Sequence, residues 1–272
     1  DVYKTQDEAY QYENITTEML QGMVDRLNRV MKNDMINAPS SVDLNVTFEL
    51  AETDNLGKPL KERGINRVQL WDGIDGNSYI NDYLIWDLDK YLNIWVGEHQ
   101  DEYSLRIQYP QYILDNGSEL QMYEWRTLQK VESVEDASYW GYTEVGIALN
   151  KKHLYNMPNA SNWADMGGTS ERFESCIGQF FGLYPTWWSP YGGAADDFCS
   201  DTYTGTDMSL HFEKWTYEPG ASSKNEYKNG HEIYFDSFNI MDQNTFCSTI
   251  TYEQALRMRT VMENCPFRMM RK

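Results

Sequence analysis

Two hydrophobic periods follow one another near the start of the chain, and together they constrain the fold class more than any other feature. After Thr16 and Thr17, which are natural helix N-caps, apolar side chains recur every three or four residues and predict an amphipathic helix from about residue 17 to residue 32. Residues 42–50 then alternate between apolar and polar side chains, which is typical of a half-buried strand. The apolar positions are Leu20, Met23, Val24, Leu27 and Met31 in the helix, and Val42, Leu44, Val46, Phe48 and Leu50 in the strand.

Both kinds of element recur farther along. Residues 91–96 predict a strand that is more central than the one at 42–50, and residues 142–149 predict another strand. Residues 173–181 carry an apolar stripe at helical spacing; Thr169 or Ser170 can cap its start, and Gly182 can end it in the left-handed conformation.

The last helix is marked at both ends. Residues 251–254 read T-Y-E-Q, which is a capping box, and Pro266 ends the apolar stripe that follows. The fold class is therefore α+β. No internal repeat or linker-like run divides the 272 residues, so we expect a single domain over residues 1–272.

Acidic side chains strongly outnumber basic ones. Asp and Glu total 42 against 23 Lys and Arg, which gives a formal net charge of −19. A field of this sign repels phosphate backbones, so we expect no nucleic acid partner. No run of about 18 apolar residues occurs, and we expect no transmembrane segment. Four cysteines, Cys176, Cys199, Cys247 and Cys265, allow two disulfides at most and leave the redox compartment open.

Residues 173–187 read F-E-S-C-I-G-Q-F-F-G-L-Y-P-T-W. This stretch resembles the zinc-binding motif of the pappalysin (cytophagalysin) branch of the metzincin proteases, H-E-x-G-H-x-x-G-L-Y-H-T-F. Further segments agree with the same family in the same order, between residues 17 and 262. They are W-D-L-D-K-Y-L-N-I-W-V at 86–96, G-I-A-L-N at 146–150, D-F-C-S-D-T at 197–202, N-I-M-D at 239–242 and I-T-Y-E-Q-A-L-R-M at 250–258.

The resemblance implies a zincin or metzincin-like fold. A mixed twisted sheet and the active-site-type helix would form an upper lobe of about residues 1–182. An irregular lower lobe of about residues 183–272 would end in a helix, with the cleft between the two lobes. Met241 would be the methionine of the family's Met-turn.

The groups that carry the family's chemistry are replaced in this chain. Ser175, Gln179 and Pro185 stand at the three histidine positions, and Cys176 stands at the position of the catalytic glutamate. A hydroxyl and a carboxamide are poor zinc ligands beside imidazole, and proline has no side-chain donor atom. The family implies zinc, whereas these residues predict neither a zinc cofactor nor catalytic residues.

Two routes to activity stay open. Cys176 could act as a nucleophile, but it shares the apolar stripe and no histidine lies within the motif, so we expect it to pack as a small hydrophobe. The four histidines, His99, His153, His211 and His231, show no H-x-x-x-H spacing. A non-standard metal site would be sought first at His231 and Glu232, because relatives bring that region close to the metal.

Two clusters suggest other ligands. Asp196, Asp197, Asp201 and Asp207 offer closely spaced oxygen ligands for calcium, which several relatives are thought to hold in this half; a solvated acidic loop is the alternative. Trp187, Trp188 and Tyr191 follow the helix and would overhang the cleft, where flat aromatic faces could hold a peptide or a sugar ring. Packing of the turn is the alternative for them.

The leading hypothesis is a catalytically inactive pappalysin-like pseudoprotease that binds a peptide, protein or glycan in the retained cleft. An edge strand ending near Gly146, Ile147 and Ala148 would let an extended peptide add itself as one more strand. The alternatives are an active zinc metalloendopeptidase with a non-standard ligand set, and a structural or adhesive cell-surface module.

The resemblance also implies export, to the periplasm, to the cell surface as a lipoprotein, or to the medium. Relatives link the loop after the helix to the segment after the Met-turn, which implies a disulfide between Cys199 and Cys247. The oligomeric state stays open.

Overall fold

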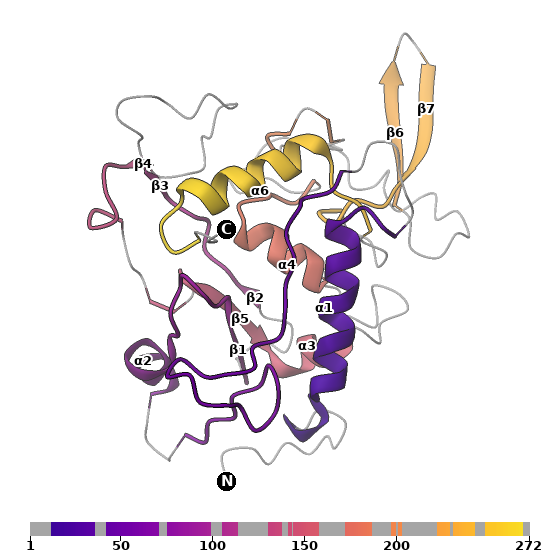
Figure 1. Cartoon of the computed structure of the whole chain (residues 1–272). Helices are drawn as coiled ribbons and strands as arrows, with labels where there is room; N and C mark the ends of the chain where they lie inside the picture. Colours follow the sequence, from indigo (N-terminus) through magenta and orange to yellow (C-terminus); the bar gives the residue numbers. More distant parts are fainter. Residues whose placement is uncertain are drawn as a thin grey trace.

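The structure is a computed structural model. It describes residues 12–35, 42–70, 75–98, 105–113, 130–137, 141–142, 144–157, 172–186, 197–199, 201–202, 222–228, 231–242 and 248–268. The described helices are η2 (Tyr12–Asn14), α1 (Thr17–Met31), α2 (Gly76–Tyr79), the π-helical η3 (Ile80–Leu84), α3 (Lys151–Asn156), α4 (Phe173–Phe180) and α6 (Tyr252–Asn264). The described strands are β1 (Asn93–Gly97), β2 (Leu105–Arg106), β3 (Tyr112–Ile113), β4 (Lys130–Val131), β5 (Gly146–Asn150), β6 (Ser222–Lys228) and β7 (His231–Ser237) (Figure 1).

The largest described sheet has the strand order β1, β5, β2. Strand β1 runs parallel to β5, with Asn93 opposite Gly146, and β2 runs antiparallel to β5 on its other side. All five residues of β5 are buried, as expected for a strand that is paired on both sides. The predicted strands at 91–96 and 142–149 are therefore present as β1 and β5, with shifted bounds, and β5 is the central strand of the described sheet.

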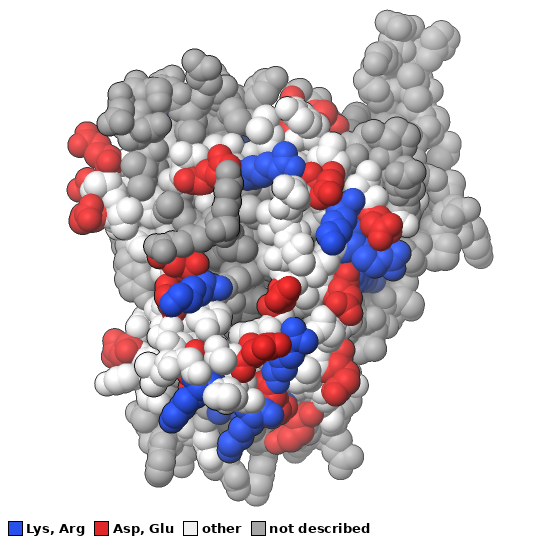
Figure 2. Space-filling view, in the orientation of Figure 1, with Lys and Arg blue, Asp and Glu red and all other residues white. Residues whose placement is uncertain are grey.

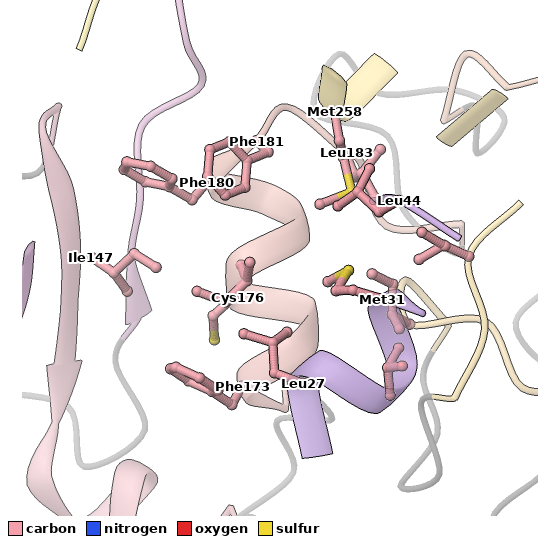
Figure 3. Packing of buried hydrophobic residues seen from close by; sticks show 14 of the residues in the cluster. Leu27, Met31, Leu44, Ile147, Phe173, Cys176, Phe180, Phe181, Leu183 and Met258 are labelled. Carbon is pink, nitrogen blue, oxygen red and sulfur yellow. The ribbon is translucent and has the colours of Figure 1, made fainter. Parts of the chain in front are cut away.

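Helix α1 begins and ends close to the prediction. The Thr16 side chain accepts a hydrogen bond from Met19 N, which satisfies a backbone donor in the first turn. The apolar stripe of α1 packs against α4, and Arg26 on α1 pairs with the buried Glu174 of α4 at 2.8 Å (Figures 1 and 3). Helix α1 therefore covers the side of α4 that faces away from the sheet.

Residues 42–50 form no strand, although their burial alternates as predicted, with even-numbered residues inward and odd-numbered residues exposed. Asn45 has φ 60°, which lies in the left-handed region and interrupts the extended backbone. The side chain of Asn28, in helix α1, forms the hydrogen bonds that a neighbouring strand would otherwise make to this backbone. Asn28 donates to Phe48 O and accepts from Phe48 N, both at 2.8 Å.

Helix α6 lies across the same core from the other end of the chain (Figure 1). Thr251 and Gln254 form the predicted capping box, and the helix ends at Asn264, two residues before Pro266. In Figure 1 the β6–β7 hairpin stands away from the other labelled elements, and its two strands pair in register from Ser222 with Ser237 to Lys228 with His231.

Basic and acidic side chains of the described residues are interspersed on the face shown in Figure 2, without a broad basic patch on that face. Within the described residues, no helix has both the length and the apolar character that a membrane span requires.

Candidate functional site

Helix α4 carries the positions that would matter most in a metzincin, and it is buried almost completely. Of its eight residues only Gln179 is partly exposed. The N-cap is Arg172, whose side chain makes no capping hydrogen bond. The prediction that Thr169 or Ser170 caps this helix is therefore wrong: both lie outside the described residues, and the helix begins after Arg172.

The carboxyl end of α4 follows the prediction. Gly182 has φ 88°, and its amide donates to Gln179 O at 2.9 Å. Leu183 N donates to Gly178 O at 2.9 Å, which completes a Schellman motif. Glycine suits this position because a Cβ would be strained at such a φ. The turn sends residues 183–186 back along the core.

Ser175 stands where the first histidine of the family would be. Its hydroxyl donates a 2.5 Å hydrogen bond to Ile240 O, and Ser175 is 3% exposed. Cys176, at the glutamate position, is fully buried among Leu27, Ile147 and Phe173 (Figure 3). A buried thiol in apolar surroundings packs as a hydrophobe.

Met241 lies in a turn that rests directly on α4. A Cβ placed on Gly178 would stand 2.9 Å from Met241 Sδ, so a larger residue there would require the methionine side chain to shift. Asn239 holds this turn: its Oδ1 accepts from Met241 N at 2.9 Å, and its amide exchanges two hydrogen bonds with Gln254, of 2.7 and 3.0 Å. The turn is thus anchored to the start of α6.

The segment after the glycine turn is tied to the same place. Thr186 N donates to Met241 O at 3.1 Å, and the Thr186 hydroxyl donates to the Asp242 carboxylate. Pro185, at the third histidine position, is buried and contributes no donor atom. Ser175 and Thr186 therefore reach the Met241 turn from two separate segments.

These residues do not fit a zinc ion. The Ser175 proton is already committed to a carbonyl, Gln179 offers only a carboxamide, and Pro185 offers nothing. Among the residues that the structure describes, no three His, Cys, Asp or Glu side chains come close enough together to hold a metal.

Two buried arginines at the carboxyl end of α4 were missed by the sequence analysis. Arg257 Nε donates to Gly182 O at 2.6 Å. Arg268 Nε donates to Phe180 O at 3.0 Å, and its other nitrogens donate to Gln108 O at 3.0 Å and to Glu144 O. A helix end with unsatisfied carbonyls carries partial negative charge, which favours cations there.

Burial changes the pKa values of Arg268 and of the nearby Glu144. Desolvation lowers the pKa of Arg268 to about 10, against the opposing effect of Glu144. Desolvation also raises the pKa of Glu144, and the nearby Arg268 only partly offsets this. Arg257 lies within the R-M pair that matched the family, which was a usable signal; Arg268 resembles an ordinary basic residue near a helix end.

The two described members of the acidic cluster, Asp197 and Asp201, accept hydrogen bonds from neighbouring protein groups. Asp197 is buried and accepts from the Thr202 hydroxyl at 2.7 Å. Asp201 accepts from the Thr251 hydroxyl at 2.7 Å and from Glu253 N at 2.9 Å, so it caps helix α6. Asp196 and Asp207 lie outside the described residues.

Cys199 is a free, buried thiol, so the expected disulfide with Cys247 is not formed. Burial, with Asp197 adding to the effect, raises the pKa of Cys199. Because disulfide exchange needs the thiolate, this environment disfavours bridge formation. Cys247 itself lies outside the described residues.

The expected peptide-binding edge is also wrong as placed. Gly146, Ile147 and Ala148 belong to β5, which is paired with β1 and β2 and presents no edge. Within the described sheet, the outer strands are β1 and β2. Period and composition do not reveal the order of strands, because strand order depends on pairing between distant segments.

The remaining candidates are only partly described. Trp187, Trp188, Tyr191, His99 and His211 lie outside the described residues. His153 is buried in α3. His231 and Glu232 begin strand β7, and only their backbone is described.

A parallel strand pair, a buried helix that ends in a glycine turn, and the turn of Met241 packed on that helix are the main features of a mixed α/β fold. The fold matches that of mirolysin, a pappalysin-family metzincin peptidase. Mature Tannerella forsythia mirolysin, solved in complex with a cleaved peptide, has a TM-score of 0.55 and 19% identity over 95% of this chain and 88% of that chain.

Two further structures agree. Mirolysin in complex with compound 9 has a TM-score of 0.54 and 18% identity over 95% of this chain and 88% of its own. A Tannerella forsythia promirolysin mutant has a TM-score of 0.57 and 18% identity over 96% and 78%. No known family profile and no curated protein sequence matches the chain.

Proposed function

We propose that this chain is a catalytically inactive metzincin-fold protein that acts by binding an extended segment of another protein. The observation that carries the proposal is the buried hydrogen bond from Ser175 to Ile240 O. It stands where the first metal ligand of a peptidase would be, and the next two ligand positions, Gln179 and Pro185, offer no imidazole. Without a metal ion to lower the pKa of water, the peptidase reaction loses its nucleophile.

The ligand class follows from the sheet and the charge. Strand β2 (Leu105–Arg106) is an outer strand of the described sheet, and an outer strand can accept one more strand from a partner. One of the similar mirolysin structures holds a cleaved peptide. The net charge of −19 favours a basic partner by long-range attraction. We therefore propose a peptide or unfolded protein segment rich in Lys and Arg, rather than a glycan.

A metal and cleavage assay tests the inactive half of the proposal. We expect purified protein to carry no stoichiometric zinc by elemental analysis, and to leave denatured casein intact with zinc added. About one zinc per chain together with chelator-sensitive cleavage would establish the alternative, an active metalloendopeptidase with a non-standard ligand set.

A peptide and glycan array tests the binding half. We expect basic peptides to be retained, with affinity falling as salt rises. A Trp187→Ala and Trp188→Ala double variant asks whether the aromatic residues after the helix contribute. Tyr83→Ala is the matched control, because Tyr83 is an exposed aromatic side chain on η3. Retention of glycans only, or loss of binding with Tyr83→Ala alone, would contradict the proposal.

An adhesive or structural role is the second candidate. It is favoured by the β6–β7 hairpin, which stands away from the other labelled elements in Figure 1. Deleting residues 222–237 should abolish partner binding under this role and leave it unchanged under the first. For either role we propose an exported protein at the cell surface, in the periplasm or in the medium; fractionation of the source cells tests this.

A further inference from the structure

In the family that this chain resembles, a metal ion would join helix positions 175 and 179 to position 185 beyond the glycine turn. Here these positions hold Ser175, Gln179 and Pro185, which do not fit the ion. The helix and the segment after it must therefore be held together by something else. The protein's own contacts show what does this.

Both segments are tied to the turn of residues 239–242. From helix α4, the Ser175 hydroxyl donates to Ile240 O at 2.5 Å. From the segment after the glycine turn, Thr186 donates through its amide to Met241 O at 3.1 Å and through its hydroxyl to Asp242. Ser175, Thr186 and Asp242 are each at most 3% exposed.

The 239–242 turn is itself firmly held. Gln254 at the start of α6 exchanges two hydrogen bonds with Asn239, and Ile240 N donates to Thr249 O at 3.0 Å. Because the turn is anchored on α6, it can hold α4 and residues 183–186 in place together.

We propose that this turn replaces the metal ion as the cross-link of the site: the Ser175–Ile240 hydrogen bond is the tie that a changed ligand position supplies, and the Thr186–Asp242 hydrogen bond, between two residues that match the family's motifs, completes the link to the segment after the glycine turn. The helix and the segment after it are joined by protein alone, so folding is independent of metal. Because these groups are buried, the hydrogen bonds are costly to lose: a buried carbonyl or carboxylate that loses a donor keeps its desolvation penalty.

Thermal unfolding with zinc and with chelator tests metal independence. A native-state zinc site filled at about a hundredfold excess over its dissociation constant would raise Tm by several degrees. We expect Tm to be the same with zinc chloride, with a chelator and with neither. A chelator-induced fall in Tm would overturn the proposal.

Substitutions test the cross-link itself. We expect Ser175→Ala and Thr186→Val each to lower Tm by about 2–4 °C or more. Thr260→Val is the matched control: it removes a hydroxyl that donates to Leu256 O, one turn earlier in the same helix α6. If Ser175→Ala and Thr186→Val lower Tm no more than Thr260→Val does, the proposal is wrong.

Hydrogen exchange separates a local tie from general destabilisation. In Ser175→Ala, peptides covering residues 181–186 and 238–242 should exchange faster, while a peptide covering 255–264 keeps its protection. Uniform acceleration of all three would contradict the proposal. If Thr186→Val yields no folded protein, Thr186→Ser, which keeps the hydroxyl, must restore folding; failure to do so would overturn the role of the hydroxyl.

This inference does not depend on the proposed ligand. A protein that binds no peptide but keeps its Tm in chelator would contradict the proposed function and support the cross-link. A protein that binds peptide but loses stability in chelator would support the proposed binding function and contradict the cross-link.

Discussion

The backbone of Gly146 lies against the indole ring of Trp95, on the neighbouring strand. A Cβ added to Gly146 would stand 2.3 Å from Trp95 Cζ3 and 2.4 Å from Asn93 O. Trp95 is held in place by Tyr142, whose ring meets it edge to face at 5.2 Å. Glycine at position 146 is therefore required by packing between β1 and β5.

We predict that Gly146→Ala destabilises the protein by about 1–3 kcal/mol, because the added Cβ would overlap the backbone oxygen of Asn93, which belongs to the paired strand β1. Gly22→Ala is the control: Gly22 lies in helix α1 with nothing within 4 Å of an added Cβ, so it should gain about 0.5–1 kcal/mol. Urea unfolding measures both. A neutral Gly146→Ala that loses ligand binding would instead make Gly146 a binding residue.

Arg268 should be one of the most sensitive positions in the chain. It is 2% exposed and donates to the carbonyls of Phe180, Glu144 and Gln108. Arg268→Ala removes a donor from three carbonyls at a buried place and should cost about 3 kcal/mol or more.

Two other variants, Arg268→Lys and Arg259→Ala, test why Arg268 is important. Arg268→Lys should recover little, because an ammonium cannot reproduce the planar fork of the guanidinium. Arg259→Ala, which removes donors to Leu44 O and Asp43 O at a more exposed place, should cost only about 1 kcal/mol. Equal losses at Arg259 and Arg268 would show that burial is not what makes Arg268 important.

Glu144 should make stability depend on pH. Desolvation raises its folded-state pKa above the ordinary value of 4.5, against the attraction of Arg268. Between these two pKa values the folded state binds more protons than the unfolded state, so stability falls as pH rises from the ordinary pKa through the raised one.

Glu144→Gln removes this dependence. We expect the variant to be more stable than the wild type at neutral pH and to match it more closely below pH 4.5, the ordinary pKa. Urea midpoints measured across that range decide the matter. A variant that is less stable at neutral pH would mean that Arg268 stabilises the ionised carboxylate more than burial penalises it.

Asp201 should stabilise helix α6 whether or not calcium is present. Its carboxylate accepts from the Thr251 hydroxyl and from Glu253 N, so Asp201→Ala should cost about 1–2 kcal/mol. Asp25→Ala, which removes an exposed carboxylate that accepts from Gln21 on α1, should change stability by less than about 0.5 kcal/mol. A loss at Asp201 seen only with calcium would restore the cation site.

The buried thiols should be unreactive in the folded protein. Burial raises the pKa of Cys265 to about 12 and also raises that of Cys199. Alkylation at neutral pH should be slow in the native state, and both thiols should be modified after unfolding without a reductant. Mass spectrometry of the peptides checks this; a Cys199 that stays unmodified after unfolding would show a disulfide.

Local signals were enough where one segment decides its own shape. Thr16, the Thr251–Gln254 capping box and Gly182 set the ends of their helices as predicted, because a cap acts within a few residues of itself. Residues 42–50, by contrast, were predicted to form a strand and do not. Their alternating burial was predictable, but a strand also needs a partner, and at this place Asn28 satisfies the backbone of Phe48 instead.

At the site, the sequence showed which groups are missing, and the structure shows what the remaining ones do. That Ser175 stands at a histidine position of the motif it resembles can be read from the sequence; that its hydroxyl donates to Ile240 O, 65 residues later, cannot. The same holds for Thr186 with Asp242 and for Arg268 with its three carbonyls. Each of these contacts joins segments whose distance depends on the packing of the whole core.

The sequence by itself determined helices α1, α4 and α6, the glycine turn after α4 and the absence of His and Glu from residues 175–185, because these follow from local spacing and from side-chain chemistry. Only the tertiary structure decided that β5 is the central strand, that Asp201 caps a helix, and that the 239–242 turn holds helix α4. Strand order and the pairing of buried polar groups depend on which distant segments come together. A hydrogen bond between two such segments cannot be predicted from the local sequence of either one.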